Sequence, residues 1–164
     1  MMTPTQVASL IDKHAATLVL FARQWCREPE DVVQDAFVKL VRQRQPPLDA
    51  VAWLYRVVRN GAIDAGKTAQ RRKRRETVVS RPERWFVEDE IDGLDAETAV
   101  AALERLAGEE REVIVARYWG GLSFEQIAAM VGCSASTAFR RYTSALEQLR
   151  RNLGIPCPNR SSNA

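Results

Sequence analysis

The chain has 164 residues, of which 46% are hydrophobic, 27% are charged and 7% are aromatic, and its formal net charge is +3. This composition fits an ordinary soluble protein of one domain or two small ones, and no run approaches the roughly 20 apolar residues that a membrane helix needs. A short apolar stretch at 15–22 lacks a signal cleavage pattern, so we expect a cytoplasmic protein with no membrane insertion. The three cysteines and the single histidine lack metal-ligand spacing, so we expect no metal or cofactor.

The first half of the chain carries apolar residues at helical intervals. Two amphipathic helices are predicted, and Pro46 and Pro47 are expected to end the second of them. A third helical pattern runs from Val51 through Leu54 and Val58 into a basic run. The apolar positions of the first two helices are Val7, Leu10, Ile11, Leu18, Phe21, Trp25, Val33, Ala36, Phe37, Leu40 and Val41.

Charge is segregated along the chain. The third helix ends in Lys67 and the five basic residues 71–75, whereas acidic residues are dense from Glu83 to Glu97. The helical periodicity lapses between Thr77 and about Leu94, which predicts a flexible acidic linker. A basic block beside an acidic one indicates a polyanion-binding surface and a separate segment that avoids it, so we expect two domains.

The second half predicts a helix-turn-helix. Ser123 followed by Gln126 is a capping-box signature, Gly132 suits a tight turn with positive φ, and Ser134 or Ser136 can cap the next helix. The inner face of that helix carries Ala138, Tyr142, Ala145, Leu146 and Leu149. Its outer face presents residues that can contact phosphates and base edges in a major groove, namely Ser136, Thr137, Arg140, Arg141 and Ser144.

Each of these patterns also has a simpler interpretation. Arg140 and Arg141 can belong to a solvated helix face, and core packing is the preferred interpretation for Tyr118 and Trp119. On the third helix, a stripe of polar and aromatic residues lies off the apolar face. An aromatic plane, an amide and cationic groups together suit single-stranded or melting DNA, although Trp53 in the core with solvated arginines is the alternative. The stripe consists of Trp53, Arg56, Asn60, Asp64 and Lys67.

Three blocks, in order, carry a resemblance. They are "PEDVVQDAFVKLVRQ" at 29–43, "AWLYRVVRNGAIDAGKTAQRRKRRE" at 52–76 and "REVIVARYWGGLSFEQIAAMVGCSASTAFRRYTSALEQLRR" at 111–151. Over about residues 5–152 the chain resembles an extracytoplasmic-function sigma factor, the minimal bacterial initiation factor that has only the conserved regions two and four. Three ordered blocks are far more specific than a single helix-turn-helix.

The resemblance implies an all-α protein of two small helical domains. Residues 5–76 would form region two, a helical bundle; residues 77–94 the linker; residues 95–152 region four, with the helix-turn-helix; and residues 153–164 a disordered tail. The implied partners are core RNA polymerase, promoter DNA and an anti-sigma factor. The protein would direct the polymerase to specific promoters and would not be an enzyme.

The resemblance also assigns residues to these partners. The polymerase contacts would be Asp31, Gln34, Asp35 and Lys39, with Val33, Phe37 and Leu40 in the core. The minus-ten element would be melted and read by Trp53, Arg56, Arg59, Asn60, Lys67, Arg71, Arg72, Arg74 and Arg75. The minus-thirty-five element would be read by Ser134, Ser136, Thr137, Arg140, Arg141 and Ser144.

Two other classes stay open at this point. A helix-turn-helix regulator that acts without core polymerase would use the second half and leave the first unexplained. An enzyme is disfavoured because the sequence has no Gly-rich phosphate loop, and its single histidine, His14, has no nucleophile or carboxylate spaced around it.

Overall fold

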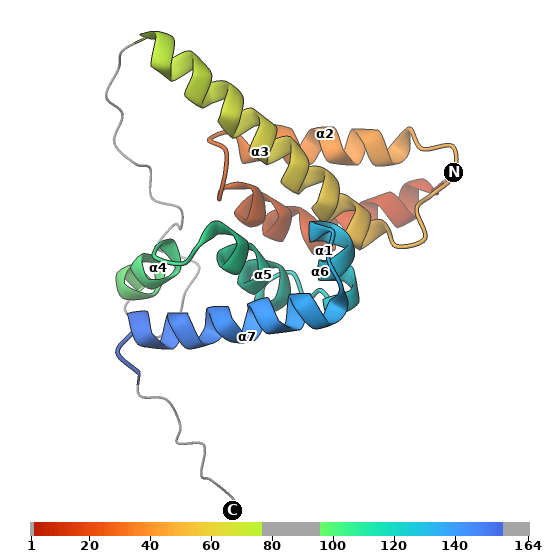
Figure 1. Cartoon of the computed structure of the whole chain (residues 1–164). Helices are drawn as coiled ribbons and strands as arrows, with labels where there is room; N and C mark the ends of the chain where they lie inside the picture. The colour runs from red at the N-terminus through yellow and green to blue at the C-terminus, as the bar shows by residue number, and fades with distance from the viewer. Residues whose placement is uncertain (1, 77–95, 156–164) are drawn as a thin grey trace, which may run out of the picture.

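The computed structural model describes residues 2–76 and 96–155, and within these ranges it contains seven α-helices and no strand (Figure 1). The all-α prediction is therefore confirmed. The predicted linker at 77–94 and residues 156–164 of the predicted tail lie outside the described residues. None of the described helices combines the length and the apolar character needed to cross a bilayer.

Helices α1 (Pro4–Ala22), α2 (Pro29–Val41) and α3 (Ala50–Glu76) form the N-terminal half. Thr3 and Gln6 begin α1 with a capping box, and the Asp49 carboxylate accepts a hydrogen bond from the Ala52 amide at the start of α3 (2.9 Å). The three helices pack against one another through a buried apolar face on each. That shared core contains Leu18, Leu20, Phe21, Ala22, Val33, Ala36, Phe37, Leu40, Leu54, Tyr55, Val58 and Ala62.

The second helix ends earlier than the sequence predicted. The prediction placed its end at Pro46 and Pro47, but α2 ends at Val41 and Arg42 is its C-cap. Residues 42–45 are Arg-Gln-Arg-Gln, which offer no apolar side chain to the core. Since most helical stability in proteins comes from packing of an apolar face, the helix ends where that face ends.

Helix α3 is the longest element and is buried only in part. Its 27 residues give it a length of about 40 Å. The last buried residue is Ala62, and residues 67–75 are exposed on a stretch of helix that extends beyond α1 and α2 (Figure 1). The helix therefore has a packed N-terminal part and a projecting C-terminal part.

Helices α4 (Ala96–Glu104), α5 (Gly108–Tyr118), α6 (Phe124–Val131) and α7 (Ala135–Asn152) form the C-terminal half. The predicted capping box of Ser123 and Gln126 begins α6, and Gly132 ends it with φ 77°. Ser134, rather than Ser136, caps α7 by accepting from the Thr137 amide. Helices α6 and α7 thus form the predicted helix-turn-helix, with Ala138 and Ala145 of α7 buried.

The two halves pack against each other. Helix α3 contacts α6 as well as α1 and α2, and α1 also contacts α5. The Tyr55 side chain is fully buried in this junction, and a Cβ atom added to Gly120 would lie 2.7 Å from its hydroxyl oxygen. The close approach of the two halves at this point therefore needs a residue without a side chain.

One predicted core position is wrong. Trp119 is partly buried against the core, but Tyr118 is 74% exposed. The packed part of α5 ends with Ala116, and Tyr118 is the last residue of the helix. Its ring lies edge-on against Trp119, with the ring centroids 4.8 Å apart, instead of entering the core.

Candidate nucleic-acid interface

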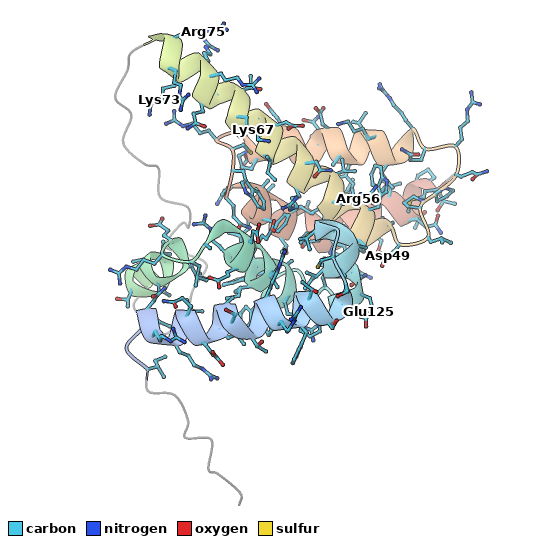
Figure 2. All side chains as sticks on the ribbon, in the orientation of Figure 1. Asp49, Arg56, Lys67, Lys73, Arg75 and Glu125 are labelled. Atoms are coloured by element: carbon cyan, nitrogen blue, oxygen red, sulfur yellow. The ribbon has the colours of Figure 1, made fainter. Side chains whose placement is uncertain are left out.

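The exposed end of α3 concentrates positive charge. All the predicted basic contacts there are exposed, and with Lys73 they form what we call the basic tip, residues 67–75 (Figure 2). Cationic side chains near a helix C-terminus are favoured by the helix dipole, so the tip is electrostatically compatible with a helical conformation. The same charges can neutralise backbone phosphates. The members of the tip that were predicted to contact DNA are Lys67, Arg71, Arg72, Arg74 and Arg75.

A polar stripe connects the basic tip to the packed part of α3. Arg56 and Asn60 are both exposed and lie one helical turn apart, on the face that continues to Lys67. Arg56 and Lys67 are labelled in Figure 2. Trp53 precedes them by one turn, but it is partly buried and packs against the core. The structure therefore brings together an amide and a guanidinium on a solvent-facing stripe and leaves only part of the indole accessible.

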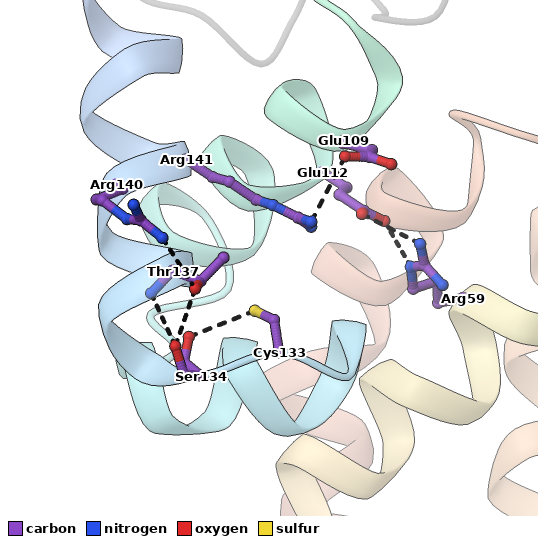
Figure 3. Close-up of polar contacts among 8 residues, drawn as sticks. All are labelled: Arg59, Glu109, Glu112, Cys133, Ser134, Thr137, Arg140 and Arg141. Carbon is purple, nitrogen blue, oxygen red and sulfur yellow. Dashed lines mark hydrogen bonds and ion pairs between the residues drawn. The ribbon is translucent and has the colours of Figure 1, made fainter.

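Arg59 has a different environment from the rest of the predicted minus-ten set. Its Nε donates to Glu112 Oε2 at 2.6 Å and its Nη2 donates to Oε1 at 3.1 Å (Figure 3). Glu112 lies on α5 and is only 1% exposed, so this bidentate pair joins the two halves in a largely desolvated place. Burial raises the pKa of the Glu112 carboxyl, and the hydrogen bonds from Arg59 oppose that shift.

Sequence reasoning did not identify Glu112. A signal was present, because Glu112 shares a helical stripe with Val115, Ala116 and Trp119 and is the charged member of an otherwise apolar face. A carboxylate on such a face needs a cationic partner, since an unpaired buried charge is costly. The sequence alone does not say that this partner is 53 residues away.

The outer face of α7 carries the predicted minus-thirty-five set. Ser136, Arg140 and Ser144 are exposed, and Arg140 Nη2 donates to Thr137 Oγ1 at 3.4 Å (Figure 3). The Ser134 hydroxyl is engaged as the N-cap and contacts both Thr137 and Ser136. Its first role is therefore to hold the start of the helix.

Two acidic residues of α5 lie beside this face. Glu109 forms an ion pair with Arg141 at 3.6 Å (Figure 3). The Ser144 hydroxyl donates to Glu110 Oε1 at 3.2 Å. These groups line a shallow hollow between the N-terminus of α5 and the outer face of α7. The contacts orient Arg141 and Ser144, although exposed pairs of this kind add little stability.

The predicted polymerase contacts share the exposed side of α2. Asp31, Gln34, Asp35 and Lys39 are all exposed, whereas the three predicted core residues of this helix are buried. The structure adds two apolar positions to this side, Val38 (39% exposed) and Val41 (49% exposed). Their spacing of four and seven residues after Gln34 could have indicated them from the sequence.

Comparison with known proteins matches the two halves to two family models. Residues 10–75 match the model described as sigma-70 region 2, and residues 102–151 match the model described as sigma-70, region 4. Among curated relatives, the ECF RNA polymerase sigma factor SigL of Mycobacterium tuberculosis is 32% identical over 154 residues, which cover 88% of this chain and 87% of SigL. The RNA polymerase sigma factor CarQ of Myxococcus xanthus is 28% identical over 155 residues, which cover 88% of this chain and 87% of CarQ.

Two solved structures share the fold. The sigma factor RpoE from Bartonella quintana, crystallised with the anti-sigma factor NepR, superposes with a TM-score of 0.74 at 22% identity and covers 93% of this chain and 99% of that one. CnrH, solved in complex with the cytosolic domain of CnrY, superposes with a TM-score of 0.62 at 24% identity and covers 93% and 90% of the two chains.

Proposed function

This chain belongs to the extracytoplasmic-function sigma factors of RNA polymerase, and from this premise we propose how its surfaces divide the work of promoter recognition. It is a sigma factor, whose partners are core RNA polymerase and promoter DNA. The observation that carries the proposal is a single helix, α3, on which an exposed guanidinium and amide lead into the basic tip.

In this proposal the two domains are region two, residues 5–76, and region four, residues 95–152. Asn60 and Arg56 act on the opened minus-ten element, with the rim of Trp53 beside them, because an amide and stacking planes recognise unpaired bases. The basic tip grips the adjacent phosphates. Arg140, Arg141 and the neighbouring hydroxyls of α7 read duplex DNA at the minus-thirty-five element.

The exposed side of α2 is proposed to bind core polymerase. It offers two carboxylates one turn apart, Asp31 and Asp35, beside the exposed methyl groups of Val38 and Val41. Acidic groups next to a small apolar area suit a basic, partly apolar docking surface on the polymerase. The sigma factor contributes binding and positioning in this scheme and no catalytic group of its own, and it works in the cytoplasm, where the polymerase is.

The two solved structures also motivate a proposal about regulation. Both are complexes in which a sigma factor of this fold is held by a second protein, NepR in one and CnrY in the other. We infer that this chain likewise has an anti-sigma partner. Affinity capture from its own cells under conditions in which its promoters are silent tests this, and recovery of core polymerase alone would contradict it.

Transcription of sheared genomic DNA by purified core polymerase tests the function directly. With the sigma factor added, sequencing of transcript 5′ ends should reveal a limited set of new start sites with a shared upstream pattern. Asp31→Lys with Asp35→Lys should lose core binding and these starts, whereas Glu104→Lys with Glu147→Lys applies the same change of charge to exposed residues elsewhere and should keep them. Duplex binding without any sigma-dependent transcript would favour a regulator that acts without polymerase.

A further inference from the structure

The contact between the two halves uses surface that promoter binding needs. Arg59 belongs to the predicted minus-ten set, but its Nε and Nη2 atoms donate to Glu112, which is buried on α5. The Nε–Nη2 edge is one that could bind a phosphate through two parallel hydrogen bonds, and it is not available to DNA while it is paired with Glu112. The Glu112 carboxylate therefore binds Arg59 where a DNA phosphate would otherwise bind it.

The ion pair is one of three contacts in a row along α3. At the start of the helix, Gln126 of α6 donates to Asp49 Oδ2 at 2.8 Å. Between these two polar contacts, Gly120 fits against the buried Tyr55 side chain. The three contacts cover the first ten residues of α3, about 15 Å of helix. This is a continuous docking surface rather than a single crossing point.

The arrangement in which the two halves pack together, which we call the closed arrangement, is too short to reach both promoter elements. By the names of the elements their separation is about 25 base pairs, which is roughly 85 Å at roughly 3.4 Å per base pair. The path from Asn60 to Asp49, across to Gln126 and on to Arg140 spans at most roughly 70 Å, including the side chains at both ends. Simultaneous binding of both elements along straight duplex therefore requires the halves to separate.

We propose that Glu112 is an intramolecular competitor for promoter DNA: through Arg59 it holds the free sigma factor closed, and the pair must break before both elements are bound. This inference rests on the proposed function. Residues of both halves take part, and the contact sets a free energy that polymerase and promoter must supply when they select the open form.

The first experiment measures closure without DNA. Spin labels at Thr68→Cys and Glu147→Cys, with the native cysteines replaced by serine, report the distance between the halves. The free protein should give one narrow distribution. Glu112→Gln, which removes the charge and keeps the shape, should broaden it toward longer distances, whereas Glu109→Gln on the same helix should not. A broad distribution in the unsubstituted protein, or no change in Glu112→Gln, would overturn the proposal and leave the proposed function standing.

The second experiment measures inhibition. Glu112→Gln should bind a promoter found by genomic transcription at least about fivefold more tightly in the presence of core polymerase, because less free energy is spent on opening. A carboxylate with a purely structural role would weaken binding when removed. Unchanged or weaker binding by a variant whose circular dichroism matches the parent would contradict the proposal.

A covalent lock covers the case in which Glu112→Gln does not fold. Asp49→Cys and Gln126→Cys can be joined by a short bis-methanethiosulfonate linker, since the native side chains meet at 2.8 Å. The joined protein should not form promoter complexes with core polymerase, and reduction of the linker should restore them. Equal activity before and after reduction would show that closure does not compete with promoter binding. Failure of the unsubstituted protein to initiate at all would instead identify the proposed function as wrong.

Discussion

Replacement of Gly66 by alanine is expected to destabilise the protein, although the same change in an exposed helix would stabilise it by about 1 kcal/mol. Gly66 lies in α3 where the helix crosses the chain that follows α1. A Cβ atom added there would lie far inside contact distance of the Trp25 carbonyl oxygen. Because the obstacle is a backbone atom, no rotamer change can relieve the overlap, and the connection between α1 and α2 must move.

The magnitude follows from two opposing terms. Overpacking costs about 1–3 kcal/mol when side chains and backbone must shift, and more when the obstacle is rigid. After the gain in helix propensity, we expect a net loss of at least about 1 kcal/mol in the free energy of unfolding for Gly66→Ala. Urea denaturation followed by circular dichroism measures this as a lower midpoint with an unchanged slope.

Two other glycines provide a graded control. A Cβ on Gly61 would lie 3.1 Å from the Val32 Cγ1 atom, which can give way, so Gly61→Ala should change stability by less than about 1 kcal/mol. Gly108, the first residue of α5, has nothing within 4 Å, and Gly108→Ala should be neutral or slightly stabilising. If Gly66→Ala were as stable as Gly108→Ala, the close crossing of α3 over Trp25 would not exist in solution.

Three further predictions concern DNA and pH. Alanine at Arg71, Arg72, Arg74 and Arg75 should lower promoter affinity and reduce the slope of log affinity against log salt by about 3, whereas lysine at the same positions should keep the slope. Equal slopes for the two variants would mean that the basic tip is solvated and does not bind DNA. Arg140→Ala should weaken initial duplex binding by about 1–3 kcal/mol if the contact is bidentate to a guanine, whereas Asn60→Ala should reduce the permanganate-reactive, melted promoter. A template mismatched in the minus-ten element should rescue Asn60→Ala more than Arg140→Ala, and equal rescue of the two variants would contradict the division of labour between the two halves. Burial raises the pKa of Tyr55, so its contribution to stability is complete below the unfolded pKa of about 10 and declines by up to about 1.4 kcal/mol per pH unit as the pH rises beyond it. The free energy of unfolding in urea should therefore depend less on pH between about pH 9 and 11 in Tyr55→Phe than in the parent, and parallel pH profiles would show that Tyr55 ionises without opening of the structure.

Local chemistry explains which features could be predicted from the sequence. The capping box at Ser123 and Gln126, the left-handed turn at Gly132 and the alternation of buried and exposed positions on α2 each depend on residues within one or two turns. The predicted helix-turn-helix follows from these signals. The exposure of Arg56, Asn60 and the basic tip follows from the same periodicity.

Features that depend on long-range packing were not predictable in the same way. The partner of Arg59 is supplied by a helix on the other side of the acidic segment, so its spacing in the sequence carries no periodic signal. Tyr118 has an apolar ring in a largely buried helix, and only the position of the helix end leaves it exposed. Helical periodicity identifies one face of α3, but it does not show that a second group of helices covers part of the other.

Helix α3 is uninterrupted, so it fixes the distance between the groups that it carries. Asn60 and Arg75 belong to one helix from Ala50 to Glu76, so about 22 Å of rigid backbone separates them, a distance close to six or seven base pairs of duplex. In the proposed function, the number of residues between Asn60 and the basic tip therefore sets the spacing between the opened base and the bound phosphates. One residue inserted after Gly66, which leaves the crossing with Trp25 in place, would turn every cation beyond it by about 100°. Seven inserted residues would restore the direction of those cations but move them about 10 Å further along the helix axis.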